Sequence, residues 1–152
     1  MNAITRFYDK GVAIAGSRLV EGAALFLLRI ALAGVFWRSG QTKVLEGSVL
    51  KIDPSQYDLF RGEFSGLPLD PVIAVPLTTF AEHLFPALLL LGLATRFSAV
   101  ALLVMTLVIQ IFVFPDAWWP VHSLWAAMAA ILIVRGGGLF SLDALIARMR
   151  TK

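Results

Sequence analysis

The chain has 152 residues, of which 59% are hydrophobic and 15% are charged. Average globular chains carry charges on about a quarter of their residues, so the apolar excess here has to face lipid or a partner. The absence of cysteine excludes disulfides, thiolate metal sites and iron–sulfur clusters ligated by this chain. The net charge of +3 does not indicate nucleic-acid binding, because the basic residues lie at chain ends and in loops, as topology signals do.

The segment before residue 20 has the pattern of a helix with one apolar face. Its apolar residues recur at helical spacing, and they are Ile4, Phe7, Tyr8, Val12 and Ala15. Such a helix lies along the membrane interface rather than across the bilayer. Arg18 interrupts the apolar stretch soon afterwards, so we do not expect a cleavable signal peptide.

Four later segments predict membrane spans, at residues 20–40, 73–93, 97–114 and 119–134. The first two are near the ~20 residues that a bilayer core requires, and the other two are shorter. A Thr95-Arg96 turn separates the second span from the third, and "FPDAWWP" separates the third from the fourth. The predicted fold is an all-α integral membrane protein, with a four-transmembrane-helix bundle in a single domain over residues 1–152.

Residues 41–72 form the one long polar stretch, with turn signals at "DPS" and "LPLDP". Loops of this length are usually functional or disordered. The aromatic side chains of Tyr57, Phe60 and Phe64 favour an ordered cap. We therefore predict a lid that contains a short amphipathic helix over residues 56–64.

Residues 139–152 predict a second interfacial segment. Glycines at 136–138 end the fourth span, and Ser141 can cap a new helix with Asp143 behind it. The apolar stripe of this helix lies opposite Arg148 and Arg150, and it consists of Leu142, Leu145, Ile146 and Met149.

The distribution of lysine and arginine predicts the topology. Eight of these residues fall on the side that holds both chain ends and the Thr95-Arg96 turn, and four fall on the side of the long loop. Because short cytoplasmic segments carry the excess of basic residues, both termini are expected in the cytoplasm and the long loop outside.

Two charged residues lie near the predicted midplane of the membrane. Arg29 lies nine residues into the first span, about 13 Å deep, and Glu82 lies nine residues into the second from the other side. Each charge at that depth costs about 2.5–3.5 kcal/mol, so we expect the two to form an ion pair. The pair could be structural, fixing helix register, or it could be part of a site, and the sequence leaves both open.

Polar residues also accumulate in the outer half of the predicted bundle, at Arg38, Lys43, Gln110 and His122. Together with aromatic walls from Phe36, Trp37, Phe114 and Trp125, they predict a pocket under the loop, suited to an amphipathic molecule such as a quinone headgroup. Each residue also has a simpler explanation. Arg38 and Lys43 could snorkel, Gln110 could bond between helices, and His122 could anchor at the interface.

The two histidines do not predict a metal or haem site. His83 points about 100° away from Glu82 on the same helix, which makes it a secondary candidate. His83 and His122 differ by roughly 10 Å in depth, which disfavours a haem held between them. With two histidines and no cysteine, we expect no metal bound by this chain.

Three stretches resemble the DoxX family. "LLRIALAGVFWRSGQTKV" resembles its first helix, "AEHLFPALLLLGLATRFSAVALLVMTLVIQIFV" its second and third, and "HSLWAAMAAILIVRGGGLFSLD" the part that follows. The turn "FPDAWWPVHSLW" is most similar to the DoxX-like proteins encoded beside small copper-binding secreted peptides. The residues that match recurrent positions of the family are Arg29, Gly40, Lys43, Glu82, Gly92, Arg96 and His122.

The resemblance implies a protein of the bacterial inner membrane. The family includes quinone-linked thiosulfate-oxidising subunits and proteins of membrane thiol and oxidative-stress systems. We therefore expect a redox-associated subunit that binds quinone and serves a membrane or periplasmic partner. Glu82 would exchange a proton, Arg29 would tune its acidity, and His122 with Arg38 or Lys43 would bond the quinone oxygens.

A second hypothesis is a non-catalytic scaffold for the biogenesis, secretion or maintenance of a partner, for example metal-binding peptides. In that case the Arg29 and Glu82 pair would be purely structural. The sequence leaves open whether the chain is part of an oxidoreductase, and whether it is a monomer or a homo-oligomer.

Overall fold

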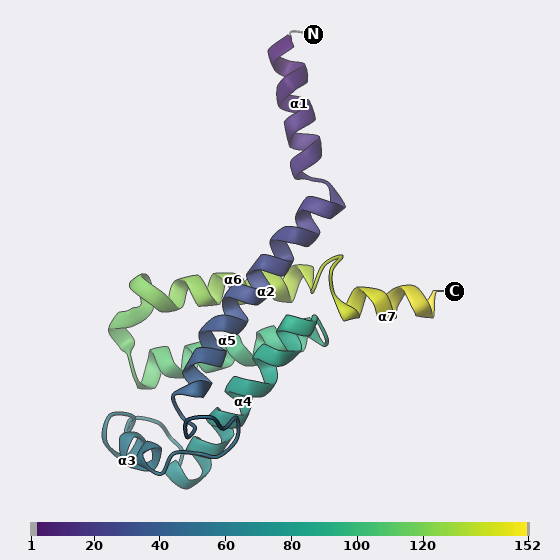
Figure 1. The fold of residues 1–152 in the computed structure, drawn as a ribbon. Helices are drawn as coiled ribbons and strands as arrows, with labels where there is room; N and C mark the ends of the chain where they lie inside the picture. Colours follow the sequence, from purple (N-terminus) through teal and green to yellow (C-terminus); the bar gives the residue numbers. More distant parts are fainter. Residues whose placement is uncertain (1–2, 152) are drawn as a thin grey trace.

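The computed structural model describes residues 3–151, and every regular element among them is helical (Figure 1). The helices are α1 (Ala3–Ala15), α2 (Arg18–Gln41), α3 (Ser55–Gly62), α4 (Pro71–Leu91), α5 (Thr95–Phe112), α6 (Ser123–Arg135) and α7 (Leu142–Arg150). Between α5 and α6 the chain forms a 3-10 turn, Pro115–Ala117, and a π turn, Trp118–His122. The all-α prediction is confirmed.

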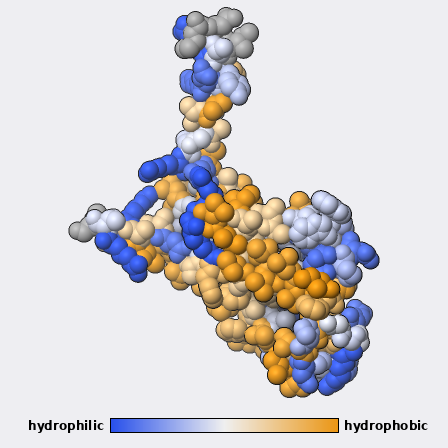
Figure 2. Space-filling view, turned by 180° about the vertical axis from the view of Figure 1, so that it is seen from behind, coloured by the Kyte–Doolittle hydropathy of each residue, from blue (hydrophilic) through white to orange (hydrophobic). Residues whose placement is uncertain are grey.

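Four segments are long and apolar enough to cross a membrane. They are Arg18–Gln41, Pro71–Leu91, Thr95–Phe112 and Pro115–Arg135. Figure 2 shows a broad apolar surface over the bundle, with hydrophilic side chains gathered toward its ends. This surface is what a bundle in contact with lipid requires, because hydrocarbon offers no polar partner.

The helix boundaries depart from the predicted spans where side chains act as caps. α4 begins at Pro71 because the Asp70 carboxylate accepts a hydrogen bond from the Val72 N–H at 2.8 Å. Near the start of the fourth span, Pro120 has no N–H to donate. The backbone widens there into the π turn, in which the Ser123 N–H donates to the Trp118 carbonyl.

The core lies where α2, α4, α5 and α6 meet. Its fully buried members include Leu32, Leu89, Leu102 and Leu132, one from each of these helices. α2 packs mainly on α4, and α5 packs mainly on α6. A Cβ at Gly40 of α2 would lie 2.8 Å from Cε1 of His83 on α4, so the two helices approach at a distance that only glycine allows.

The predicted lid helix is present as α3. Asp53 holds its start, because the carboxylate accepts a hydrogen bond from the Ser55 N–H at 2.9 Å, and this bond lowers the pKa of Asp53. Phe60 of α3 is buried against Ala74 and Val75 at the start of α4. α3 therefore covers one end of the bundle, which we call the loop end.

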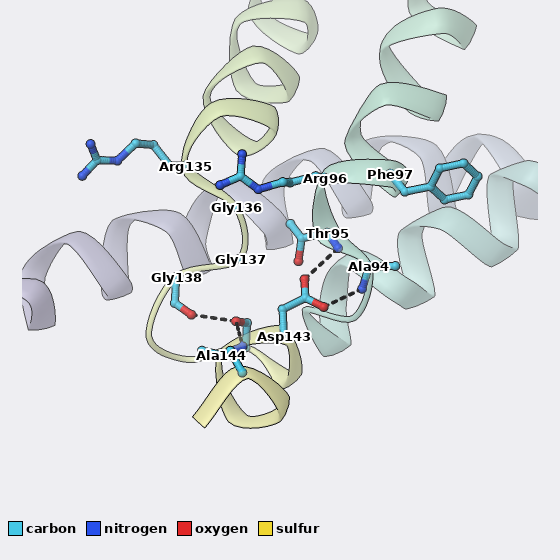
Figure 3. A pocket seen from close by; sticks show the side chains of 12 residues that line it. Ala94, Thr95, Arg96, Phe97, Arg135, Gly136, Gly137, Gly138, Asp143 and Ala144 are labelled. Carbon is cyan, nitrogen blue, oxygen red and sulfur yellow. Dashed lines mark hydrogen bonds between the residues drawn. The ribbon is translucent and has the colours of Figure 1, made fainter. Parts of the chain in front are cut away.

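The opposite end carries the turn between α4 and α5 together with α7, and we call it the turn end. Side chains satisfy the free backbone groups of the helix ends there (Figure 3). The Asp143 carboxylate accepts hydrogen bonds from the N–H groups of Ala94 and Thr95, at 2.8 and 2.9 Å. Arg96 donates to the Ile133 carbonyl near the end of α6, at 2.6 Å. Asp143 thus caps α5 from a distant part of the sequence.

Arg29 completes this arrangement from the middle of α2. Its guanidinium donates to the carbonyls of Leu89 and Leu90 in the last turn of α4, at 3.1 and 3.4 Å, and to the carbonyl of Phe140. The side chain is fully buried. Because a helix C-terminus carries partial negative charge and unpaired carbonyls, it stabilises a buried cation.

The first test concerns the Asp143 cap. We expect Asp143→Ala to destabilise the folded protein by about 1–3 kcal/mol, because two N–H groups of the α4–α5 turn lose their acceptor. Thermal unfolding of purified protein in detergent measures the loss. Asp9→Ala, on the exposed face of α1, is the matched control and should leave the midpoint unchanged. Equal midpoints for the two variants would show that the cap does not stabilise the bundle.

Candidate functional site

The loop end of the bundle encloses a cavity of about 360 Å³. Its walls come from α2, α4 and α5, from the α3 region, and from His122 and Trp125 of the fourth span. Most of the lining is apolar, and the lid contributes Phe60, Phe64, Leu67 and Leu69. Phe64 also packs edge-on against Phe114, with ring centroids 6.0 Å apart, so the lid contacts the turn that follows α5.

One wall of the cavity lies at the surface between α4 and α5. Leu77 of α4 and Val104 of α5 both line the cavity, and each is 53% exposed. The short turn at Leu91 to Thr95 holds α4 and α5 together at the turn end, where Asp143 caps it. The cavity is therefore bordered by side chains of the lipid-facing surface.

A charged cluster forms one polar side of the cavity. The Lys43 ammonium lies 2.7 Å from Oε2 of Glu82, and both residues line the cavity. Ser39 donates from Oγ to Oε1 of Glu82 at 3.1 Å, and Lys43 contacts the same Oγ at 3.2 Å. Glu82 is 2% exposed and Lys43 is 7% exposed, so the pair is desolvated.

The predicted ion pair between Arg29 and Glu82 is wrong. Arg29 reaches carbonyls at Leu89 and Leu90, which lie about two turns beyond Glu82 toward the turn end. Lys43 takes the position next to Glu82, because the chain turns at the end of α2 and directs the lysine back over Ser39. Arg29 and Glu82 have similar estimated depths in the membrane, but their side chains are not in contact.

The hydrogen-bonded side chains of His122 and Gln110 form the second polar side. His122 lines the cavity, and its Nδ1 lies 2.7 Å from Oε1 of Gln110. The Gln110 amide nitrogen donates to the Pro115 carbonyl at 2.5 Å. The His122 ring also packs on Trp125, with centroids 5.0 Å apart. Gln110 supports the histidine from outside the lining.

The structure separates the remaining candidates. Arg38 is exposed and does not line the cavity. His83 is buried and has hydrogen-bond partners on both ring nitrogens, the Thr79 carbonyl at 2.7 Å and the Gln41 side chain at 2.9 Å. Trp37 packs on His83, with ring centroids 5.1 Å apart, and lies outside the lining. Of the six predicted site residues, Glu82, Lys43 and His122 share the cavity.

Ser39 and Phe60 are among the contributors that sequence reasoning missed. Ser39 bridges Lys43 and Glu82, and its spacing of four residues before Lys43 is the signal that could have identified it. Phe60 was predicted in the lid but not as a wall of the site. Its burial depends on the docking of α3 on α4, which sequence periodicity does not give.

These features define a class of protein: a multi-pass membrane protein whose four spanning helices contact the lipid bilayer and enclose a cavity at one end. Residues 24–116 match the DoxX family, so the chain belongs to that family. It is also similar to an uncharacterized protein of Haemophilus influenzae, at 31% identity over 144 residues, covering 85% of this chain and 87% of the relative. No solved structure matches the chain.

The second test concerns the Lys43–Glu82 pair. Lys43→Met should cost about 3–5 kcal/mol of stability, because it leaves the Glu82 carboxylate buried beside Ser39 alone. The double variant Lys43→Met with Glu82→Gln should recover most of that loss, because no buried charge remains. A thermal or denaturant unfolding cycle in detergent measures the coupling.

Arg38→Met is the control for this cycle, because Arg38 is a cation in the last turn of α2, close to Lys43 in the sequence, but is exposed. It should change stability by less than about 0.5 kcal/mol. Additive losses from Lys43→Met and Glu82→Gln would mean that the two groups are not paired.

Proposed function

We propose that this DoxX protein binds a quinone, or an amphiphile of similar shape, in the loop-end cavity, and that it serves a redox partner as a membrane subunit. The observation that carries the proposal is the combination of an apolar cavity of about 360 Å³, a border at the lipid-facing surface, and a few polar side chains inside. Small-molecule sites have this composition, with apolar walls and a few convergent polar groups.

The position of the cavity border between α4 and α5 supports entry of the ligand from the bilayer. A water-soluble substrate would have to cross the exposed apolar side chains of Leu77 and Val104, whereas a lipid-soluble molecule is already among them. Inside, the Lys43–Glu82 pair carries no net charge, so a neutral headgroup can be bound without stranding a buried ion. Glu82 is then the residue that could exchange a proton with the ligand.

The proposed membrane topology follows from the distribution of basic residues. Arg96 and Arg135 lie at the turn end with α7, whose last turn carries Arg148 and Arg150. By the excess of basic residues on the cytoplasmic side, the turn end and both termini face the cytoplasm of a bacterial inner membrane, and α3 faces outward. A partner that delivers or removes electrons would then meet the lid from the periplasm, and copper-linked or oxidative-stress systems are the settings to examine.

A second candidate function is a scaffold for a partner protein without chemistry of its own. The specific observation in its favour is that Ser39, Lys43 and Glu82 are bonded and ion-paired to one another. Such a cluster would fix the packing of α2 on α4 without any ligand. Ligand binding separates this candidate from the quinone site.

The third test fills the cavity. Val108 of α5 lines it, so Val108→Phe should occupy part of the space and weaken the binding of decylubiquinone by about tenfold or more. Equilibrium binding is measured with the purified protein in nanodiscs, and quinone that co-purifies is quantified by solvent extraction. The matched control is Val100→Phe, which adds the same volume on an exposed position of α5.

The outcomes of this test are distinct. Binding by the native chain that is lost in Val108→Phe and kept in Val100→Phe supports the quinone site. If the native chain neither co-purifies with quinone nor binds decylubiquinone, the quinone site is lost and the scaffold is favoured.

A further inference from the structure

The arrangement of hydrogen-bond donors and acceptors around the cavity distinguishes between ligands. Gln110 determines part of this arrangement. The Gln110 amide nitrogen lies 2.5 Å from the Pro115 carbonyl oxygen, which can only accept a hydrogen bond. The amide orientation is therefore fixed, with Nε2 toward Pro115 and Oε1 toward His122. An amide flipped by 180° would place two acceptor oxygens against each other.

This orientation fixes the proton position on His122. Oε1 of Gln110 lies 2.7 Å from Nδ1 of His122, so Nδ1 must carry the hydrogen and donate it. In the neutral imidazole, Nε2 then holds a lone pair and no hydrogen. Among the described residues Nε2 has no hydrogen-bond partner. It is also not one of the fully buried side-chain atoms that lack a partner, so it remains accessible. The accessible nitrogen of His122 is therefore an acceptor.

The other polar side of the cavity has already used its donors. The Lys43 ammonium donates hydrogen bonds to Oγ of Ser39 at 3.2 Å and to the Ser39 carbonyl at 3.4 Å, and it forms its ion pair with Oε2 of Glu82 at 2.7 Å. The Ser39 hydroxyl donates to Oε1 of Glu82 at 3.1 Å. A ligand carbonyl would have to displace one of these contacts to obtain a hydrogen bond from Lys43 or Ser39.

The polar groups available to a ligand in the cavity are therefore mainly hydrogen-bond acceptors. A quinone ring presents two carbonyl oxygens, which accept, whereas a quinol presents two hydroxyl groups, which donate. A quinone oxygen placed against Nε2 of His122 would bring two lone pairs together, and a quinol hydroxyl in the same place would form a hydrogen bond. Trp125 also lines the cavity, and an indole N–H donates to an oxygen of either ring form, so it does not distinguish them.

We propose that the cavity selects the reduced, hydroxyl-bearing form of its aromatic ligand, with Nε2 of His122 as the acceptor for a ring hydroxyl and Gln110 as the residue that positions its proton. The proposal rests on the proposed function, because it assumes that this cavity binds a quinone-class ring. It revises the sequence-based expectation that His122, with Arg38 or Lys43, bonds the oxygens of a quinone.

The fourth test compares three ligands with the same ring and the same decyl chain, on the full chain in detergent, under argon. They are decyl-benzoquinone, decyl-hydroquinone and the dimethyl ether of decyl-hydroquinone, which has the reduced ring but no hydroxyl hydrogen. We expect decyl-hydroquinone to bind about fivefold or more tightly than either of the others, the ratio that one net hydrogen bond provides. Isothermal titration calorimetry gives the three dissociation constants.

Two variants identify the residues responsible. His122→Phe should abolish the preference, bringing the hydroquinone to the affinity of its dimethyl ether. Gln110→Met keeps the side-chain length but removes the acceptor that fixes Nδ1–H, so His122 can move its hydrogen to Nε2 and donate to a carbonyl. The ratio of hydroquinone to benzoquinone affinity should then fall toward one, a change that a purely structural role of Gln110 would not produce. The unfolding midpoint of each variant verifies that it is folded.

The results separate the two proposals. If none of the three ligands binds the native chain, the proposed function fails. If benzoquinone binds as tightly as hydroquinone, or the dimethyl ether binds as tightly as hydroquinone, the selectivity proposal is overturned while the quinone site stands. An unchanged ratio in folded His122→Phe also overturns it.

Discussion

The contact between Lys43 and Glu82 is the interaction on which the loop end depends. It joins the residues just after α2 to the middle of α4, at the level where Gly40 lets the two helices meet. A carboxylate in this position without its ammonium would be a buried, uncompensated charge, so the end of α2 has to remain over α4. The wall of the cavity formed by Ser39, Lys43 and Glu82 is a direct result.

The two ends of the bundle satisfy their polar groups in different ways. At the turn end, Arg29, Arg96 and Asp143 reach backbone groups of other helices, so the helix termini are closed by long-range side chains. At the loop end, the polar groups are paired with one another around a space that α3 covers. Capping therefore holds the turn end together. The loop end keeps a cavity in which a few polar side chains lie among apolar walls.

The number of spans, the lid helix and the Ser141 cap could be predicted from the sequence, because length, hydropathy and capping residues are local signals. The partner of Glu82 could not. Arg29 and Lys43 are both basic, and depth along a helix axis does not say which side chain turns toward Glu82. The caps formed by Arg29 and Asp143 could not be predicted either. Arg29 donates to backbone carbonyls, and Asp143 accepts from backbone N–H groups, that lie far away in the sequence. Arg38 was misplaced for a similar reason, since its position on α2 faces outward.

The position of the cavity border between α4 and α5 has a consequence for how binding should be quantified. A molecule that enters between Leu77 and Val104 leaves the hydrocarbon phase and displaces acyl chains, not water. Its occupancy then follows its mole fraction in the membrane, and the total concentration in the sample has little meaning without the amount of lipid. The competitors that set the affinity are the lipids themselves, so a change of acyl-chain composition should alter the apparent dissociation constant with no change in the protein.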